Sequence, residues 1–488
     1  MAKELIPQLQ PNRLWHHFYA LTQIPRPSGQ MAQVSQFMEY FGKSLGLETL
    51  TDQGGNILIR KPGSHGMENH QTVILQSHLD MVPQKNSDTK FDFTKDPIEA
   101  IIDGDWVRAN GTTLGADNGI GLAAMMAVLE DSSLQHGPIE ALFTVDEETG
   151  MYGAFALIEG FLRGKILLNL DSETEGEFSI GCAGGADLNI SFQYQDDKHI
   201  SEGDIGIKIK LSGLKGGHSG VDIHLGRANA NKLMFRFLKD AVQNYGARLA
   251  SIDGGSLRNA IPREASALLT IPGDDDCEGF WELVSDYKAI FNVEFEGVEN
   301  DISFSAEKVD LPPQLIPEEI QDDLINAVEA CQNGVIGYLS SFPGTVETSS
   351  NLAMIQSAEG IIEIKILVRS SSESKKMALC SSLESVFALA GAKVEFGNAY
   401  PGWDPQADSS ILSLMQDVYT KKFQRDPKVL VMHAGLECGI ILSSHPDLDC
   451  ISFGPTICFP HSPDEKVEIA SVSIFWDYLL EVLAKIPR

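Results

Sequence analysis

The first 185 residues alternate apolar strand-like runs with helical segments, and this alternation constrains the fold more than any other feature. TVILQSHLDMV (72–82), PIEALFTVDEETG (138–150) and KILLNLDSE (165–173) are each typical of a buried strand that ends in polar residues. GIGLAAMMAVLED (119–131) has small and apolar residues at helical spacing after a Gly-Ala-Asp-Asn turn. The pattern predicts an α/β fold, in which functional groups collect at the carboxyl ends of the strands.

The pattern changes between residues 186 and 399. Two segments there share one order: a strand, a helix, strands introduced by Arg/Ser-Asn, and another helix. From residue 400 the strand–helix alternation returns. We therefore expect a discontinuous first domain of residues 1–185 and 400–488, built on a mixed sheet flanked by helices. Residues 186–399 should form an inserted domain of two similar α+β lobes.

Bulk properties exclude several classes of protein. A chain of 488 residues exceeds what one hydrophobic core usually supports. The net charge of −31 argues against nucleic acid or an anionic membrane as partner. The N-terminus does not resemble a signal peptide, and no apolar run approaches the roughly 20 residues that span a bilayer. Seven irregularly spaced cysteines without a CxxC pair indicate reduced thiols, so we expect a cytoplasmic protein.

Acids and imidazoles follow the predicted strands of the first domain in a fixed order. They are His78 and Asp80 in SHLDM, Asp117 in LGADNG, Glu147 and Glu148 in VDEETG, Asp171 in LDSE, and His461 in FPHSPDE. Two histidines with three carboxylates form a ligand set suited to zinc, cobalt or manganese. One shared carboxylate would give each of two ions a histidine, a terminal acid and the bridge. Two such ions, roughly 3.5–4 Å apart, can hold a hydroxide near neutral pH.

Two close pairs have their own logic. His78 and Asp80 point to the same side of an extended chain, so Asp80 can orient the imidazole through its far nitrogen. Glu147 and Glu148 diverge, so one can bind metal while the other acts as general base. Either pair alone is more often a loop hydrogen bond or a solvated surface. Their joint occurrence at successive strand ends is what favours a metal site.

These blocks resemble a known superfamily. SHLDMV, GADNGIGLA, VDEETG, NLDSE and PHSPDE are similar to the signature blocks of the zinc aminoacylase/carboxypeptidase superfamily. HAGLECG, KGGHSGVDIH and the long two-lobed insertion resemble, within it, the carnosinase-like aminoacyl-histidine dipeptidases (Xaa-His dipeptidases). The resemblance covers essentially the whole chain and departs at no metal-binding position. The metal blocks are specific for the superfamily, whereas the dipeptidase branch rests on the softer blocks and on length.

The resemblance implies a role for each strand-end residue. Asp117 would be the bridging carboxylate, and a non-proline cis peptide bond would follow it, with Gly115 and Gly119 giving the turn room. The remaining roles are His78 and Asp171 on one metal ion, Glu148 and His461 on the other, Glu147 as general base, and Asp80 as the residue that orients His78.

The inserted domain would act as a lid and supply a second set of residues. His218 in GGHSG would stabilise the oxyanion that develops on the substrate. Asn259 in RNAIP, Arg369 in LVRSS and Gly435 in HAGLE would bind the substrate carboxylate, which an arginine can hold through two hydrogen bonds. Two further residues of the HAGLE block, His433 and Glu437, receive no role.

The predicted activity is hydrolysis of Xaa-His dipeptides, including β-alanyl-histidine, by a hydroxide between two Zn²⁺ ions per chain, with Co²⁺ or Mn²⁺ as possible substitutes. The resemblance further implies a cytoplasmic homodimer. An aminoacylase or carboxypeptidase of the same superfamily is the nearest alternative. A non-catalytic metal-binding protein would not need Glu147 or His218. A dinuclear phosphoesterase would need basic phosphate clamps, which these blocks lack.

Overall fold

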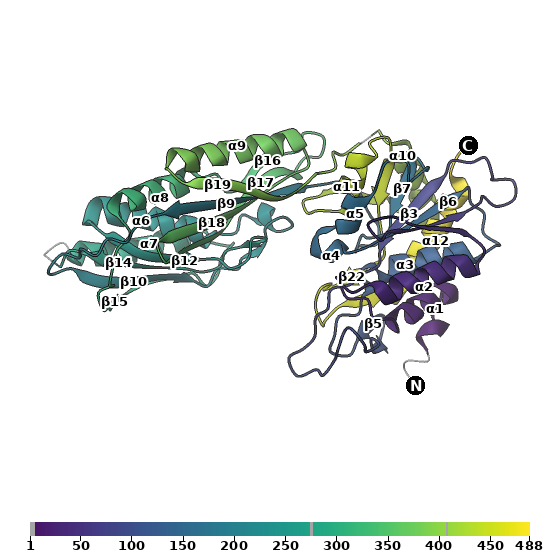
Figure 1. The fold of residues 1–488 in the computed structure, drawn as a ribbon, viewed down its shortest axis with the longest axis horizontal. Helices are drawn as coiled ribbons and strands as arrows, with labels where there is room; N and C mark the ends of the chain where they lie inside the picture. The colour runs from purple at the N-terminus through teal and green to yellow at the C-terminus, as the bar shows by residue number, and fades with distance from the viewer. Residues whose placement is uncertain (1–4, 274–276, 407) are drawn as a thin grey trace. The chain divides into compact units, whose positions relative to one another are not determined.

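The structure, a computed structural model, describes residues 5–273, 277–406 and 408–488. The chain divides into two compact units (Figure 1). Unit 1 comprises the described residues of Met1–Gly181, Trp403–Val431 and Leu436–Arg488, and unit 2 those of Cys182–Gly402 and Met432–Gly435. The unit borders lie within a few residues of the predicted ones, except that the short segment 432–435 belongs to unit 2. That the units act as catalytic domain and lid stays a prediction.

Unit 1 is built on a mixed sheet, as predicted for the first domain. Within the described ranges the sheet has eight strands in the order β1-β2-β6-β3-β7-β21-β8-β20. Their bounds are Glu48–Thr51 (β1), Ile57–Lys61 (β2), Val73–His78 (β3), Ile139–Thr144 (β6), Ile166–Asn169 (β7), Glu177–Cys182 (β8), Lys428–Met432 (β20) and Asp449–Ser452 (β21). Strand β3 runs parallel to β6 and β7, and β21 runs parallel to β7. All residues of β3, β6 and β7 are buried, as in a strand covered on both faces.

Helices flank this sheet (Figure 1). Their bounds are Ile6–Gln8 (η1), Asn12–Thr22 (α1), Ala32–Ser44 (α2), Ala116–Glu130 (α3), Glu147–Gly150 (α4), Tyr152–Ala156 (α5), Ser410–Phe423 (α10), Glu437–Ser444 (α11) and Ile469–Lys485 (α12). Helix α3 packs between β3 and α1, and every residue from Ala116 to Leu129 is buried. A helix that is apolar on all sides is typical of a buried helix, which agrees with the apolar character of this segment.

A second, smaller sheet in unit 1 carries the C-terminal histidine loop. Its strand order is β22-β23-β5-β4, with bounds Ile457–Cys458 (β22), Lys466–Glu468 (β23), Trp106–Ala109 (β5) and Ala100–Asp103 (β4). The loop between β22 and β23 contains His461. Since β22 and β23 pair antiparallel, they fix both ends of that loop.

Unit 2 is built on one large sheet with helices along one face (Figure 1), and β11 and β13 pair in a separate two-stranded sheet. The described strands run β15-β10-β14-β12-β17-β18-β9-β19, and β16 also pairs with β17. Strand bounds are Gly184–Gln193 (β9), Ile205–Ser212 (β10), Gly217–His218 (β11), Arg248–Gly254 (β12), Ala260–Ile261 (β13), Ala265–Ile271 (β14), Ser303–Val309 (β15), Gly334–Tyr338 (β16), Val346–Ala358 (β17), Ile361–Ser370 (β18) and Lys393–Tyr400 (β19). The helices are Ile223–Leu225 (η2), Ala230–Tyr245 (α6), Cys277–Glu294 (α7), Glu318–Ala330 (α8) and Glu373–Leu389 (α9).

The strands of the two predicted lobes form one continuous sheet. They join where β12 pairs with β17, at Asp253↔Gln356 and Gly254↔Ile355. The order along the chain is not kept, because β15 pairs with β10 of the first segment, whereas the earlier β9 pairs with β18 and β19 of the second. The similarity of the two lobes therefore stays a prediction, and no break in the sheet separates them.

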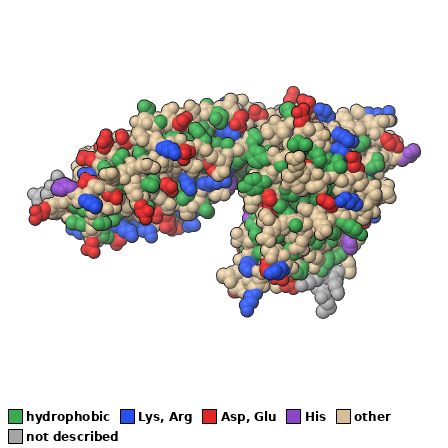
Figure 2. All heavy atoms as spheres, viewed as in Figure 1, with side chains coloured by type: hydrophobic (Ala, Val, Ile, Leu, Met, Phe, Trp, Pro, Cys, Tyr) green, Lys and Arg blue, Asp and Glu red, His purple; other side chains and the backbone are tan. Residues whose placement is uncertain are grey.

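Charged side chains are dispersed over the visible face of each unit (Figure 2). Acidic and basic side chains are interspersed there, as on an ordinary solvated surface. Among the described helices, none combines the length and apolar character that crossing a membrane requires.

Candidate functional site

The predicted metal ligands converge at one edge of the unit 1 sheet. His78 is the last residue of β3, Glu148 lies in α4 just after β6, and Asp171 follows β7. Because these three strands are parallel and adjacent, their carboxyl ends meet at the same edge. Asp117 comes from the first turn of α3, and His461 from the β22–β23 loop.

Asp117 lies between two groups of ligands. Its Oδ1 is 3.1 Å from Nε2 of His78, and its Oδ2 is 3.2 Å from Nε2 of His461. The same nitrogen of His78 is 3.4 Å from Oδ1 of Asp171. The same nitrogen of His461 is 3.0 Å from Oε2 of Glu148. Each oxygen of one carboxylate thus faces its own histidine–acid pair.

The spacing of these atoms fits metal ions. Two ligand atoms on a tetrahedral zinc, each about 2.0–2.1 Å from the ion, lie roughly 3.3 Å apart. The histidine–carboxylate distances of 3.0–3.4 Å match that separation. Oε1 of Glu148 and Oδ1 of Asp171 are buried without a hydrogen-bond partner among the described residues. A buried carboxylate oxygen without a hydrogen-bond partner favours a bound cation, so these residues fit a dinuclear centre.

The pKa values of the buried acids at this edge also favour a bound cation. Burial, and then the charges of Asp117 and Glu148, raise the pKa of Asp171 to about 6, although His78 opposes the shift. Hydrogen bonds to Asp117 and Glu148 raise the pKa of His461 to about 11. Burial places the pKa of Glu147 well above its ordinary value, and neighbouring acids add to that shift. Acids this crowded favour bound positive charge.

Asp80 makes more contacts than the sequence predicted. Its Oδ1 lies 3.4 Å from Nδ1 of His78, and its backbone carbonyl is nearer to that nitrogen, at 3.1 Å. Its carboxylate also accepts hydrogen bonds from Ser28 Oγ (2.8 Å) and from the backbone N–H groups of Glu147 (3.0 Å) and Glu148 (3.2 Å). Burial opposes ionisation, but these bonds and His78 lower the pKa of Asp80 to about 2. Asp80 therefore connects β3 to α4 as an ionised group.

The peptide bond between Asp117 and Asn118 is cis, as the resemblance implied. Gly115 has φ +71°, which a glycine adopts without strain. A Cβ atom on Gly115 or Gly119 would lie 2.6 or 2.8 Å from Nη2 of Arg26. The two glycines therefore give room to a buried arginine from the loop after α1.

Glu437, to which the sequence gave no role, lies beneath the same edge at the start of α11. Its Oε2 accepts hydrogen bonds from Gln76 Nε2 (2.6 Å) and Thr144 Oγ1 (2.7 Å), while Oε1 has no partner among the described residues. Burial raises the pKa of Glu437 to about 7. It adds a fully buried acid behind β3 and β6.

In unit 2, His218 is held in one tautomer. It lies in β11, and its Nδ1 accepts hydrogen bonds from the backbone N–H groups of Gly220 (3.1 Å) and Val221 (3.0 Å). The ring proton must then be on Nε2. Burial, and then the charge of Arg369, lower the pKa of His218 to about 4. At neutral pH the side chain is an uncharged N–H donor.

Arg369 is a buried cation. It lies near the end of β18, is only 5% exposed, and has no carboxylate partner among the described residues. Its Nη1 donates to the hydroxyl of Tyr400 (2.9 Å). Gly435 packs against that ring, since a Cβ there would lie 2.9 Å from Tyr400 Cε2. We call Arg369, Tyr400 and Gly435 the anion pocket.

The remaining predicted residues lie around this pocket. Nε2 of His433 is 2.7 Å from Ser349 Oγ, and burial followed by the charge of Arg369 lowers the pKa of His433 to about 3. The backbone carbonyl of Asn259 accepts a hydrogen bond from Ser219 N (2.8 Å). Among the described residues the Asn259 side chain, which is exposed, makes no hydrogen bond to the pocket. Its predicted contact with a carboxylate stays a prediction.

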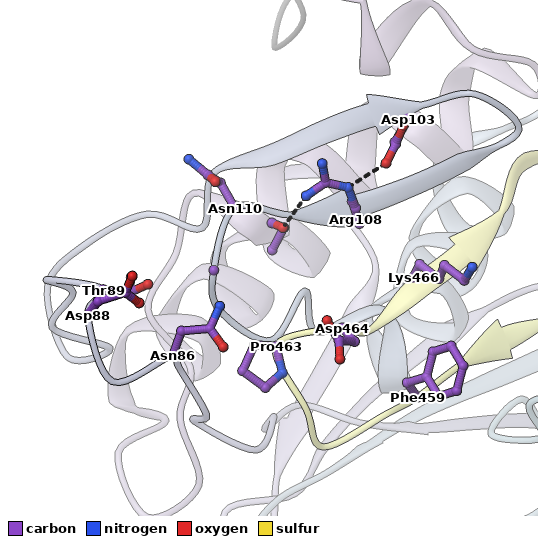
Figure 3. A pocket seen from close by; sticks show the side chains of 12 residues that line it. Asn86, Asp88, Thr89, Asp103, Arg108, Asn110, Phe459, Pro463, Asp464 and Lys466 are labelled. Atoms are coloured by element: carbon purple, nitrogen blue, oxygen red, sulfur yellow. Dashed lines mark hydrogen bonds and ion pairs between the residues drawn. The ribbon is translucent and has the colours of Figure 1, made fainter.

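A cavity of about 600 Å³ lies beside the His461 loop, and Figure 3 shows the residues that line it. Arg108 bonds to Asp103 across one wall, while Pro463, Asp464 and Lys466 come from the loop and β23. None of the described lining residues is one of the five predicted ligands.

Comparison with known proteins identifies the family. The profile of "Peptidase family M20/M25/M40" matches residues 74–485, which is most of the chain. The chain belongs to peptidase family M20/M25/M40. It is therefore an enzyme of the peptidase class, and the superfamily resemblance predicted from the sequence is confirmed.

Individual proteins match over nearly their whole length. Cytosol non-specific dipeptidase of Escherichia coli (strain K12) is 45% identical over 480 residues, which cover 98% of this chain and 99% of that one. The crystal structure of aminoacylhistidine dipeptidase from Vibrio alginolyticus superposes with a TM-score of 0.92 at 46% identity, covering 99% of this chain and 98% of that one. A tripeptidase from Staphylococcus aureus has a TM-score of 0.58 at 16% identity over 98% and 99% of the chains, which shows the shared fold alone. These comparisons confirm the predicted fold class.

Proposed function

We propose that this M20/M25/M40 peptidase is a cytoplasmic dipeptidase whose centre holds two divalent metal ions. The five ligands would be His78, Asp117, Glu148, Asp171 and His461. One observation carries the proposal: the two oxygens of Asp117 lie 3.1 and 3.2 Å from different imidazoles, so one acid can serve two ions. When bound, two such cations supply Lewis acidity that polarises an amide carbonyl and lowers the pKa of water.

The metal identity is proposed from the ligand types. Two imidazoles with three carboxylates suit zinc, and Co²⁺ or Mn²⁺ could substitute. His78 and Asp171 would hold one ion, and Glu148 and His461 the other, with Asp117 shared. The relatives' structures and names do not assign these residues in this chain, so the ligand set rests on the distances given above.

The protein's own groups perform the proton transfers. Glu147 accepts a proton from the attacking water and delivers it to the amine that leaves as the C–N bond breaks. Asp80 holds the backbone N–H of Glu147 and the imidazole of His78, so the base and one ligand keep a fixed relation. His218 donates its Nε2–H to the oxyanion that forms on the carbonyl. Its lowered pKa keeps it in the neutral form that this donation uses.

The anion pocket supports a substrate with a free carboxylate. A buried arginine without an acid is costly unless a ligand supplies the charge, and Arg369 is such a residue. Its planar fork can bind a carboxylate through two hydrogen bonds, while the Tyr400 hydroxyl and the Gly435 N–H add donors. We assign the α-carboxylate of the substrate to this pocket, with Asn259 as an additional contact.

The names of two relatives support dipeptides, and not longer or acylated substrates, as the substrates proposed here. The E. coli protein is named a non-specific dipeptidase of the cytosol, and the Vibrio protein an aminoacylhistidine dipeptidase. We infer that Xaa-His dipeptides, including β-alanyl-histidine, are substrates here, and that the chain works as a homodimer in the cytoplasm. The molar mass in solution tests the dimer independently of activity.

A substrate panel tests the proposed function. Purified protein, loaded with Zn²⁺ or with Co²⁺, is assayed on β-alanyl-histidine, several other Xaa-His and Xaa-Xaa dipeptides, a tripeptide and N-acetyl amino acids. We expect hydrolysis of the dipeptides and little of the acylated amino acids. Preferential hydrolysis of N-acetyl amino acids would assign the chain instead to an aminoacylase, and removal of one C-terminal residue from longer peptides to a carboxypeptidase.

A further inference from the structure

Glu465 lies four residues after His461, at the end of the same loop. Its side chain is 2% exposed, and its two oxygens accept four backbone hydrogen bonds from the turn that carries Asp117. Oε2 accepts from the N–H groups of Leu114 (2.7 Å) and Gly115 (2.9 Å). Oε1 accepts from those of Ala116 (2.8 Å) and Asp117 (3.2 Å).

These four amides form an anion-binding concavity. Successive N–H groups converge when one residue of a turn is left-handed, and Gly115 has φ +71°. In many proteins such a nest binds a phosphate or another external anion. Here the anion is a carboxylate of the chain itself, and it comes from the loop that contains His461.

Arg26 holds the same turn from its other side. This arginine is 2% exposed. Its Nη1 donates to the carbonyl oxygens of Leu79 (3.0 Å) and Asp80 (2.8 Å), and its Nη2 donates to the carbonyl of Gly115. One buried cation therefore ties the end of β3, where His78 lies, to the turn of Asp117. One buried anion ties that turn to the His461 loop.

The backbone at His461 needs such support. Its φ is +59°, a conformation that residues other than glycine seldom adopt. Such residues persist where the surrounding structure holds them. Within the loop, the described hydrogen bonds are local turn bonds: Glu465 N to Ser462 O (3.0 Å), Ser462 Oγ to Phe459 O (2.8 Å) and Asp464 N to Ser462 Oγ (3.2 Å). The carboxylate of Glu465 thus ties this loop to the backbone of the turn that carries Asp117.

We propose that Glu465 and Arg26 are positioning residues that set the separation between His78, Asp117 and His461 before metal binds. Neither touches the ligand atoms, and both act through the backbone of the turn. The inference rests on the ligand set proposed above and deepens it. It gives Glu465 a role in metal affinity that its sequence neighbours do not share.

Isosteric variants test the inference through metal binding alone. In Glu465→Gln the side-chain NH₂ would face two of the four amide donors and could not accept from them. Asp464→Asn is the matched control: it makes the same charge change one residue earlier, on an exposed side chain that faces the cavity of Figure 3. Metal-free proteins are titrated with Co²⁺ against a competing chelator, and the visible spectrum is recorded at saturation.

We expect Glu465→Gln to bind Co²⁺ about 10–100-fold more weakly, as is typical when a group that orients metal ligands is lost. Its spectrum at saturating Co²⁺ should also differ from that of the unaltered protein, which a mere loss of stability would not cause. Asp464→Asn should match the unaltered protein in both. Unchanged affinity and spectrum in Glu465→Gln, or an equal loss in Asp464→Asn, would overturn the inference.

A second variant covers failure to fold. Arg26→Lys keeps the charge, but a single ammonium cannot reproduce the planar fork that serves three carbonyl oxygens. If Glu465→Gln does not fold, weaker Co²⁺ binding by Arg26→Lys supports the inference and unchanged binding refutes it. If the unaltered protein itself fails to bind two Co²⁺ ions, the ligand set falls together with the inference. If the unaltered protein binds two Co²⁺ ions and the variants bind them with the same affinity, only the positioning role is refuted.

Discussion

The carboxylate of Asp80 accepts a 3.0 Å hydrogen bond from the backbone N–H of Glu147. A single acid therefore fixes the first residue of α4 and also lies 3.4 Å from Nδ1 of His78. This contact gives a fixed start to the short helix α4, whose first two residues are Glu147 and Glu148. The proposed general base and a proposed metal ligand thereby share one support.

Removing the proposed base separates chemistry from metal binding. Glu147→Ala should retain both metal ions and lose about 100- to 10,000-fold in turnover, the usual contribution of general acid–base catalysis. The exposed Glu159 offers a matched control, and Glu159→Ala should keep normal turnover. Steady-state kinetics with metal analysis of the same samples measure both effects. Turnover of Glu147→Ala close to that of the control would remove Glu147 from this role.

Replacing the shared acid should affect both ions. Asp117→Asn leaves one oxygen and no negative charge between His78 and His461, so at least one ion should be lost. Its Zn²⁺ affinity should fall by more than the roughly 10–100-fold that outer groups contribute. Competition against a chelator measures it. If Asp117→Asn keeps two ions with ordinary affinity, the bridge does not exist.

The anion pocket predicts dependence on a free substrate carboxylate. Arg369→Met removes charged hydrogen bonds of about 1.5–3 kcal/mol, so kcat/KM for a dipeptide should fall about 10- to 100-fold. The corresponding dipeptide amide, which lacks the carboxylate, should lose much less. Arg236→Met is the control, since the Arg236 side chain is 41% exposed and already paired with Glu294. Equal losses on both substrates would mean that Arg369 supports the fold and not recognition.

The sheet edge where the predicted metal ligands meet was predictable, because it depends on short-range patterns. A β-branched run followed by His-Leu-Asp or Asp-Glu-Glu places polar groups at a strand end, and parallel strands then bring those ends together. The structure places His78, Asp171 and the Glu147–Glu148 pair there for that reason. His461 is different: nothing in Phe-Pro-His-Ser-Pro indicates a distant partner, and it was placed by resemblance.

Residues whose contacts join segments far apart in the sequence were not predictable. Arg26 lies between two prolines and reads as a surface loop residue, although it is buried beside two glycines that make room for it. Glu465 closes a block that was recognised for its histidine, and its four amide partners lie some 350 positions earlier. Tyr400 is at the end of a half-exposed strand, and its contact with Arg369 depends on how β18 and β19 flank β9.

The titration of His218 tests its proposed state. Its folded pKa of about 4 lies below the ordinary value of 6.5, so between these pH values only the unfolded chain binds the proton. Stability should therefore fall as pH drops from 6.5 towards 4, and His218→Gln should fall less steeply. NMR of the labelled ring should show the neutral Nε2–H tautomer at pH 6. A ring that protonates near pH 6.5 would contradict the assignment.

The central claim is that one carboxylate joins two metal ions. Crystals of the zinc-loaded protein, with diffraction measured on both sides of the zinc absorption edge, locate each ion directly. We expect two anomalous peaks roughly 3.5–4 Å apart, one beside each oxygen of Asp117. His78 and Asp171 should coordinate the first, and Glu148 and His461 the second. A single peak, or two peaks that do not share Asp117, would contradict it.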